Sequence, residues 1–416
     1  MNPNILILCT HDSGRFFGCY GVETVSSTNI DRLASEGVLL DQFTAASPIC
    51  SPSRGAMMTG TWPQENGLLG LTHHGFRFKT GVRHAADLFR KANYETTLFH
   101  FQHVAERQDW SALGYEQYLS PSRDEEFLRY PDMAIPAPVL GHDVAKWLRG
   151  RESDRPFFAH VNFNETHTPF DFGGVDPDRC RGVTVPPWIR HDTEAEKHFS
   201  MLQGAVSSLD KGVGQIMEAL DQAGLRDNTL VVFTTDHGLE GARDKWTVYE
   251  SGIGIAGVVR FPAAGIGGGR RVATPLSNVD LLPTLLELAG LKVPEYLSGE
   301  SFAPLLSGQP GGTKNRPVFS IYHNGGSRSV RVGDWKLIRN LLAEPYQEAA
   351  PVTLGGTGIR HPRLPAELYF LADDPSETNN LAERHPNRVR ELSSLLGEWM
   401  RATGDPAFIG GYVNLS

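Results

Sequence analysis

The sequence predicts an α/β protein with a doubly wound, mostly parallel sheet flanked by helices, followed by a smaller α+β unit. Continuous apolar runs of strand length, beginning with Ile5-Leu6-Ile7-Leu8, are typical of strands buried on both faces. Segments with helical periodicity separate these runs, as crossover helices separate parallel strands. After about Gly312 the strands alternate polar and apolar residues, which indicates an antiparallel sheet.

The first unit, residues 1–312, contains most of the expected elements. Thr28-Asn29 is a candidate cap for a helix over residues 30–36, and Gly37 is a candidate stop. Further expected strands cover residues 96–101, 156–163 and 229–235. Further expected helices cover residues 84–93, 141–149 and 194–223.

The second unit, residues 313–416, is expected to carry the antiparallel sheet. Gly333-Asp334 is typical of a tight turn between two strands. The expected strands cover residues 318–322, 328–332, 335–340 and 367–371, and an expected helix covers 387–402.

Composition excludes several classes of protein. The formal net charge of -9 argues against non-specific binding of nucleic acid and against a basic face for a long polyanion. No apolar run approaches the roughly 18 residues of a membrane helix, and no secretory leader pattern is evident, so we expect a cytoplasmic protein that does not span a membrane. Four scattered cysteines without a CxxC pair indicate neither a disulfide framework nor a thiolate zinc site.

Two acidic motifs follow two of the predicted strands. The first strand ends in Thr10-His11-Asp12, and the strand over 229–235 is followed by Asp236-His237. Ligands of open α/β sheets bind at the carboxyl ends of the strands. Either pair alone is more simply explained as a cap of a turn or helix, but together they favour one divalent cation. Carboxylates prefer Ca²⁺ or Mg²⁺, whereas imidazoles shift the preference towards Mn²⁺, Fe²⁺ or Zn²⁺.

A third motif, CSPSR over residues 50–54, is typical of an anion site. Pro52 suits the first turn of a helix running through Met58, which places Cys50 at the helix N-terminus. Arg54 follows four residues later and returns to the same face. The alternative is an ordinary buried thiol, but the C-x-P-S-R string arises by chance in on the order of one in a thousand chains of this length.

Three further polar residues lie near the same sheet edge. His103 follows the strand over 96–101, His167 follows the strand over 156–163, and Lys245 follows Asp236-His237. Taken alone, each of these residues is more often an ordinary surface or core residue than part of a functional site. The loops expected to shape a pocket lie around residues 73–74, 170–181 and 323–328.

These motifs resemble those of the sulfatase family, over residues 4 to about 382. CSPSR followed by GAMMTG resembles the family signature, and HDSGRFFGCYG and DHGLEGARDKWTVYESG resemble its metal and lysine motifs. ELYFLADDPSETNNLA resembles its C-terminal segment. CSPSRGAMMTGTWPQENGLLGL is also similar to the sulfamidase branch, which acts on N-sulfoglucosamine. The resemblance implies an alkaline-phosphatase-like fold and hydrolysis of a sulfuric ester or sulfamate, with a small sulfated sugar as substrate.

The resemblance also implies a role for each residue. Cys50 is expected to be oxidised to formylglycine by a separate formylglycine-generating enzyme. One hydroxyl of its gem-diol attacks sulfur, and the other then expels sulfate. Arg54 matches the arginine that steadies the formylglycine, and His103 matches a histidine that hydrogen-bonds the gem-diol. His167 and Lys245 match sulfate-binding residues, either of which can protonate the leaving group. The implied metal ligands are His11, Asp12, Cys50, Asp236 and His237.

The chain departs from the family pattern at three positions. His11 and His237 stand where the family usually has aspartate and often has asparagine, so nitrogen replaces oxygen in the ligand set. Ca²⁺ is the expected metal, with Mn²⁺ as the competitor. Phe101 occupies the place of a family lysine in His100-Phe101-Gln102-His103.

Three alternative functions stay open at this point. A phosphonate monoester or phosphodiester hydrolase of the same superfamily shares the nucleophile and an Asp-His metal pair. A non-catalytic relative is disfavoured because Cys50 and Arg54 are intact, and a plain cysteine hydrolase is disfavoured because the neighbouring residues suit an oxyanion and a metal. We make no prediction of the oligomeric state.

Overall fold

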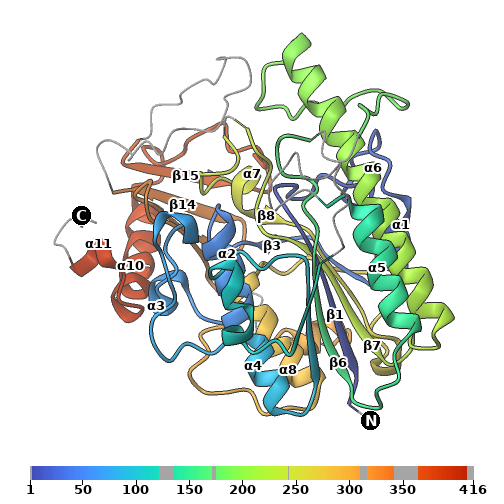
Figure 1. Cartoon of the computed structure of the whole chain (residues 1–416). Coiled ribbons are helices and arrows are strands. Elements are labelled where there is room, and N and C mark those ends of the chain that lie inside the picture. The colour runs from blue at the N-terminus through green and yellow to red at the C-terminus, as the bar shows by residue number, and fades with distance from the viewer. Residues whose placement is uncertain are drawn as a thin grey trace.

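An eight-stranded sheet forms the centre of the molecule (Figure 1). The computed structural model describes residues 2–120, 135–170, 175–241, 243–309, 316–341 and 364–409. The strand order is β10-β2-β9-β7-β1-β6-β4-β5. In chain order, these strands are β1 (Asn4–Thr10), β2 (Val38–Leu40), β4 (Glu95–Phe99), β5 (Gln117–Leu119), β6 (Phe157–Asn162), β7 (Thr229–Thr235), β9 (Gly257–Arg260) and β10 (Arg270–Val272).

The predicted parallel core of this sheet is confirmed. β1 pairs in parallel with both β6 and β7, and β4 pairs in parallel with β6 and β5. Every residue of β1 and β7 is buried, as their continuous apolar runs predict. The sheet is mixed rather than wholly parallel, because β9 runs antiparallel to both β7 and β2.

Helices cover both faces of the sheet. Figure 1 shows α1 (Thr28–Glu36), α5 (Ala137–Arg149) and α6 (Thr193–Gln222) along one side, and α2 (Cys50–Thr59), α4 (Ala85–Lys91) and α8 (Leu281–Leu288) along the other. Successive residues of β1 point to opposite faces, so Leu6 and Leu8 join one hydrophobic core whereas Ile5 and Ile7 join the second.

The predicted helices and strands differ from the observed ones mainly at their ends. α1 begins at Thr28 rather than Ile30, because the Asp210 carboxylate of α6 accepts hydrogen bonds from the backbone N–H groups of Asn29 and Ile30 at 2.8 and 2.9 Å. β4 stops at Phe99 rather than residue 101, because His100 has a φ of 74° and leaves the extended conformation.

Several short elements were not predicted. β3 (Phe43–Thr44), β8 (Gly254–Ile255) and β11 (Leu276–Ser277) form a three-stranded sheet. Within the described ranges, four helices have only four residues each: α3 (Pro63–Asn66), α7 (Glu250–Ile253), α9 (Ala303–Leu306) and α11 (Pro406–Ile409). The 3-10 turns cover Gly18–Tyr20, Thr72–His74, Arg107–Leu113, Pro262–Ala264 and Asn278–Asp280.

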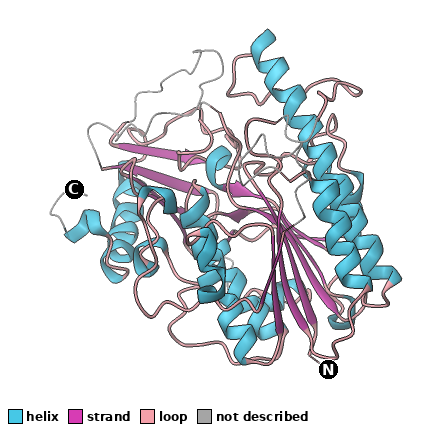
Figure 2. Ribbon diagram, in the orientation of Figure 1, coloured by secondary structure: helices cyan, strands magenta, loops and turns pink. Residues whose placement is uncertain are grey.

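The C-terminal part has the predicted antiparallel sheet, which Figure 2 shows beside the central sheet. It consists of β12 (Val318–Tyr322), β13 (Ser327–Val332), β14 (Trp335–Asn340) and β15 (Ala366–Phe370), and α10 (Pro386–Ala402) packs against β13 and β14. The Ile321 N–H donates to the carbonyl of Ala46 at 2.8 Å, so this sheet contacts the segment that leads into α2. The predicted unit boundary at residue 312 lies outside the described residues. Among the described helices, none combines the length and apolar character needed to cross a membrane.

Candidate functional site

The carboxyl ends of β1, β6 and β7 meet at one edge of the central sheet. The parallel register places Cys9 beside Asn162, and Thr10 beside Thr235. The residues that follow β1 and β7 therefore come together, as predicted. An Asp236 carboxylate oxygen accepts a hydrogen bond from the backbone N–H of Asp12 at 3.1 Å, which joins the two acidic motifs.

Four of the predicted ligands form a buried group that suits a cation. The ligating atoms of His11, Asp12, Cys50 and Asp236 all lie within 4.8 Å of one another, and all four residues are buried. Within the described part of the chain, the buried Nε2 of His11 has no hydrogen-bond partner. Because buried polar atoms are rarely left unsatisfied, this nitrogen and the two carboxylates fit a divalent metal ion.

His237, the fifth predicted ligand, is held in a suitable tautomer. Its Nδ1 lies 3.0 Å from the carbonyl of Gly238, so Nδ1 carries the proton and Nε2 offers its lone pair. Nε2 lies 3.0 Å from a carboxylate oxygen of Asp12 and 3.2 Å from Sγ of Cys50. The sulfur at position 50 therefore lies beside the same cation pocket.

Electrostatics also favour a cation in this pocket. Burial and Arg54 lower the pKa of His11, but the Asp236 and Asp12 carboxylates outweigh them and raise it to about 10. Burial raises the pKa of Asp236, but His237 and Arg54 hold it well below its usual range. Both carboxylates are therefore charged, and in the absence of a metal they draw protons onto the imidazoles. A metal ion would replace those protons.

Cys50 begins α2, as the sequence predicts. Ile49, in an extended conformation, is the N-cap residue, and Pro52 lies in the first turn. Burial raises the pKa of the Cys50 thiol, but the Lys245 ammonium and His237 lower it well below its usual range. The surroundings of position 50 therefore stabilise an anion. Burial lowers the pKa of His103, and the neighbouring Cys50 side chain opposes this shift.

Arg54 is fully buried and held at three points. Its guanidinium donates to Asp236 at 3.0 Å, to the side-chain oxygen of Asn162 at 2.6 Å and to the carbonyl of Thr10 at 3.3 Å. Phe101, which stands in place of the family lysine, lies 5.1 Å from the guanidinium and stacks on the His11 ring at 5.0 Å. This position thus packs two site residues instead of contacting an anion.

His167 and Lys245 lie on the more open side of Asp12. Lys245 Nζ is 2.7 Å from an Asp12 carboxylate oxygen and 3.5 Å from Nε2 of His167. Nδ1 of His167 lies 2.6 Å from the carbonyl of Thr168, which leaves Nε2 facing the site. The His167 side chain is 25% exposed but that of Lys245 only 5%, so His167 is the residue more open to solvent.

The structure also shows two polar residues that the sequence prediction missed. Asn162 holds Arg54 and is the last residue of β6, so the rule about strand ends could have found it. Glu240 lies three residues beyond His237, accepts a hydrogen bond from Thr168 Oγ1 at 2.5 Å and lies 4.0 Å from Lys245 Nζ. No pattern in the sequence indicated that the Glu240 carboxylate would lie in a site expected to bind an anion.

The structure describes two of the three loops predicted to shape the pocket, and part of the third. The His73 ring lies nearly parallel to that of His103, with centroids 6.3 Å apart, so the 73–74 loop does border the site. His323 contacts Phe76 with ring centroids 6.3 Å apart. Part of the loop over 170–181 lies outside the described residues.

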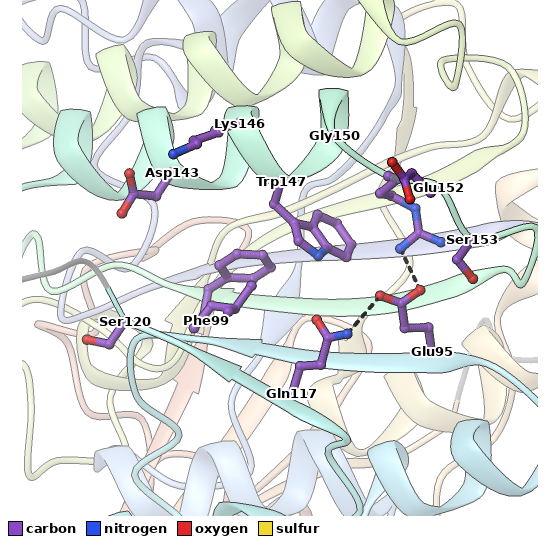
Figure 3. A pocket seen from close by; sticks show the side chains of 12 residues that line it. Glu95, Phe99, Gln117, Ser120, Asp143, Lys146, Trp147, Gly150, Glu152 and Ser153 are labelled. Atoms are coloured by element: carbon purple, nitrogen blue, oxygen red, sulfur yellow. Dashed lines mark hydrogen bonds and ion pairs between the residues drawn. The ribbon is translucent and has the colours of Figure 1, made fainter.

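A separate hollow of about 590 Å³ lies between β4, β5 and α5 (Figure 3). Its lining includes Phe99, Trp147 and the ion pair of Arg151 with Glu95 at 3.0 Å. None of the predicted site residues lines it. The candidate site is therefore the buried cluster of charged residues at the strand ends and not this hollow.

Comparisons with known proteins find sulfatases among the relatives of this chain. An ulvan-active sulfatase of Formosa agariphila is 28% identical over 427 residues, which cover 97% of this chain and 81% of that protein. The N-sulphoglucosamine sulphohydrolase of Homo sapiens is 26% identical over 473 residues, which cover 97% of this chain and 91% of that protein.

Solved structures share the fold across nearly the whole chain. A protein in complex with its substrate D-glucosamine-2-N,6-O-disulfate has a TM-score of 0.73 at 18% identity, covering 98% of this chain and 99% of that one. The phosphonate monoester hydrolase of Agrobacterium radiobacter also has a TM-score of 0.73, at 21% identity, covering 99% and 96%. At these identities the likeness concerns the fold alone.

Two family profiles match the sequence itself. The profile described as N-sulphoglucosamine sulphohydrolase, C-terminal, matches residues 238–346, which supports the resemblance to the sulfamidase branch. The profile described as Sulfatase matches residues 3–291, well over half of the chain and including all nine predicted site residues. The chain therefore belongs to the sulfatase family.

Proposed function

We propose that this sulfatase releases inorganic sulfate from a small sulfated sugar, carrying either a sulfate ester or a sulfamate. The observation that carries the proposal is the position of Cys50. Its sulfur belongs to the same buried group of potential ligands as Asp12 and Asp236, at the N-terminus of α2. A nucleophile at this position lies next to a cation pocket, where an attacking oxygen and the sulfuryl oxygens can be stabilised together.

A modified side chain at position 50 and a bound metal ion complete the proposed site. Formylglycine made from Cys50 would supply a hydrated aldehyde as nucleophile, and a divalent metal held by His11, Asp12, Asp236 and His237 would neutralise negative charge. We propose that a formylglycine-generating enzyme oxidises Cys50. Ca²⁺ is the proposed metal, with Mn²⁺ as the alternative that the two imidazoles favour.

The chain's own residues bind and orient the substrate. Burial lowers the pKa of Lys245, but Asp12 and Cys50 raise it above its usual range, so Lys245 stays charged and can bind a sulfuryl oxygen. The doubly protonated form of His167, whose Nε2 faces the site, can donate a proton to the leaving group. His103 is half-buried beside position 50 and can exchange a proton with the nucleophile.

The substrate proposal draws on the relatives and on charge. The named relatives act on ulvan and on N-sulphoglucosamine, both sulfated carbohydrates. The match of residues 238–346 to the N-sulphoglucosamine sulphohydrolase profile favours an amino sugar. The net charge of -9 disfavours a long sulfated polymer, because such a polymer is itself strongly negative.

A phosphonate monoester or phosphodiester hydrolase is the second candidate. His237 and Asp12 form an Asp-His pair beside the metal ligands, and this chain shares its fold with a phosphonate monoester hydrolase.

The test uses enzyme made in a host with maturation machinery. Peptide mass spectrometry across residue 50 and metal analysis establish its state before the assay. Rates are compared for glucosamine N-sulfate, N-acetylglucosamine 6-O-sulfate and a phenyl phosphonate monoester. We expect a sulfated sugar to give the highest kcat/KM. A higher value for the phosphonate would overturn the proposal in favour of the second candidate.

A further inference from the structure

A third carboxylate, Glu240, belongs to the open side of the site. One of its oxygens lies within 4.8 Å of a carboxylate oxygen of Asp12 and of a ring nitrogen of His167. Its side chain is only 9% exposed and lies 4.0 Å from Lys245 Nζ. Cys50 belongs to the other group of potential ligands around Asp12 and not to this one. Glu240 therefore adjoins His167, the residue proposed to protonate the leaving group.

A negative charge at this position has no role in binding sulfate. Like charges repel, so Glu240 opposes the approach of a sulfuryl group to Lys245. Lys245 does not need Glu240 to stay charged, because Asp12 already lies 2.7 Å from its ammonium. The hydrogen bond from Thr168 could equally be accepted by a neutral amide. Lys245 at 4.0 Å partly balances this charge, and the carboxylate can also attract a cation that develops on the substrate.

We propose that Glu240 recognises the nitrogen of a sulfamate and makes the enzyme selective for N-sulfated over O-sulfated substrates. This inference rests on the proposed function. The overall reaction is R–NH–SO₃⁻ + H₂O → R–NH₃⁺ + SO₄²⁻. The S–N bond breaks and its electron pair stays on nitrogen, while water supplies one oxygen to sulfur and two protons to nitrogen. An O-sulfate releases a neutral alcohol, so only the sulfamate develops a cation that a carboxylate stabilises.

The distances allow one substrate atom to contact both groups. An atom that hydrogen-bonds two partners at about 2.8 Å each can bridge a gap of up to roughly 5.6 Å. The His167 nitrogen and the Glu240 oxygen fall inside that limit at no more than 4.8 Å. A leaving nitrogen that takes a proton from His167 can thus donate a charge-assisted hydrogen bond to Glu240.

Two matched variants separate the charge of Glu240 from its contact with the loop. Glu240→Gln keeps the length of the side chain and an oxygen that can accept from Thr168, but removes the charge. Thr168→Val removes that hydrogen bond and keeps the charge. Wild type and both variants, each matured and metal-loaded, are assayed for kcat and KM on glucosamine N-sulfate and N-acetylglucosamine 6-O-sulfate.

We expect Glu240→Gln to lower kcat/KM for the N-sulfate by about tenfold more than for the O-sulfate, since a charge-assisted hydrogen bond is lost for one substrate only. Thr168→Val should change both values in equal proportion. If Glu240→Gln lowers both in equal proportion, or if wild type cleaves only the O-sulfate, the role of Glu240 is refuted and the sulfatase function stands. If wild type cleaves neither sulfated sugar, the proposed function fails as well.

Discussion

Lys336 of β14 links the C-terminal sheet to the loop that carries Lys245, and its replacement by methionine tests how this link is held. Lys336 Nζ lies 2.9 Å from Glu250 and 2.8 Å from Glu377. Glu377 in turn accepts a hydrogen bond from the Glu250 N–H at 2.5 Å, and its carbonyl accepts one from Arg243. The loop between β7 and α7 is therefore fastened to the C-terminal segment through buried charges.

Lys336→Met keeps the apolar stem and removes the ammonium. Glu250 retains Arg331 at 3.5 Å, whereas Glu377 is 2% exposed and loses the cation beside it. Removing one partner of a buried ion pair costs about 3–5 kcal/mol. We expect the loss to lie towards the lower end of that range, because a buried carboxylate can take up a proton instead of staying charged.

The loss should depend on pH. Burial already raises the pKa of Glu377, with Lys336 opposing that rise, so the variant's Glu377 has a pKa still further above its unfolded value. A carboxyl group with a raised folded pKa binds a proton more tightly in the folded state, so the stability of the variant falls as pH rises. Each unit of pKa difference is worth about 1.4 kcal/mol. The deficit relative to wild type is therefore larger at about pH 8 than at about pH 6.

The assay is urea unfolding followed by tryptophan fluorescence at these two pH values, with a fixed metal concentration. Lys292→Met is the matched control, because Lys292 is exposed and the chemical change is identical. The control should differ from wild type by less than about 0.5 kcal/mol. If Lys336→Met is no less stable than the control at either pH, the reasoning about buried charge is wrong.

The remaining predictions concern the site itself. Cys50→Ala should abolish turnover and leave the urea midpoint near that of wild type, and a rate close to wild type would refute the nucleophile assignment. Asp236→Ala should lose the metal, measured by elemental analysis, because Asp236 contributes a buried charged oxygen to the pocket; an unchanged metal content would remove it from the site. Asn162→Ala should cost about 1–3 kcal/mol of stability and lower kcat/KM, because Arg54 loses its acceptor at 2.6 Å. Unchanged values of both would show that Asn162 does not position Arg54.

Much of the fold could be predicted because its signals are local. The apolar runs of β1 and β7 are long enough to identify buried strands without knowing their neighbours. Short strands such as β2 and β9 carry no such signal, because a segment of three or four residues is too short for its pattern to distinguish a strand from a helix. Pairing with neighbours makes them strands, and the antiparallel course of β9 followed from no local pattern.

The residues of the site likewise fall into those that the sequence could identify and those that it could not. Residues at strand ends and in the CSPSR motif were predicted, because position along the chain already indicates the sheet edge on which they lie. Glu240 could not be assigned a role, since its significance depends on Lys245 and His167, and His167 is far away in the sequence. The meaning of Phe101 was likewise hidden until its contacts with His11 and Arg54 were known.

The amino-acid sequence by itself determined the chemical types of the site residues, the helix that starts at Cys50 and the strands whose ends carry the acidic motifs. Only the tertiary structure decided which charges face one another. The reason is physical: electrostatic interactions depend on distances of a few ångströms, and such distances are set by the register of β1 with β6 and β7. A pattern along the chain names the groups, whereas packing determines their pKa values and their partners.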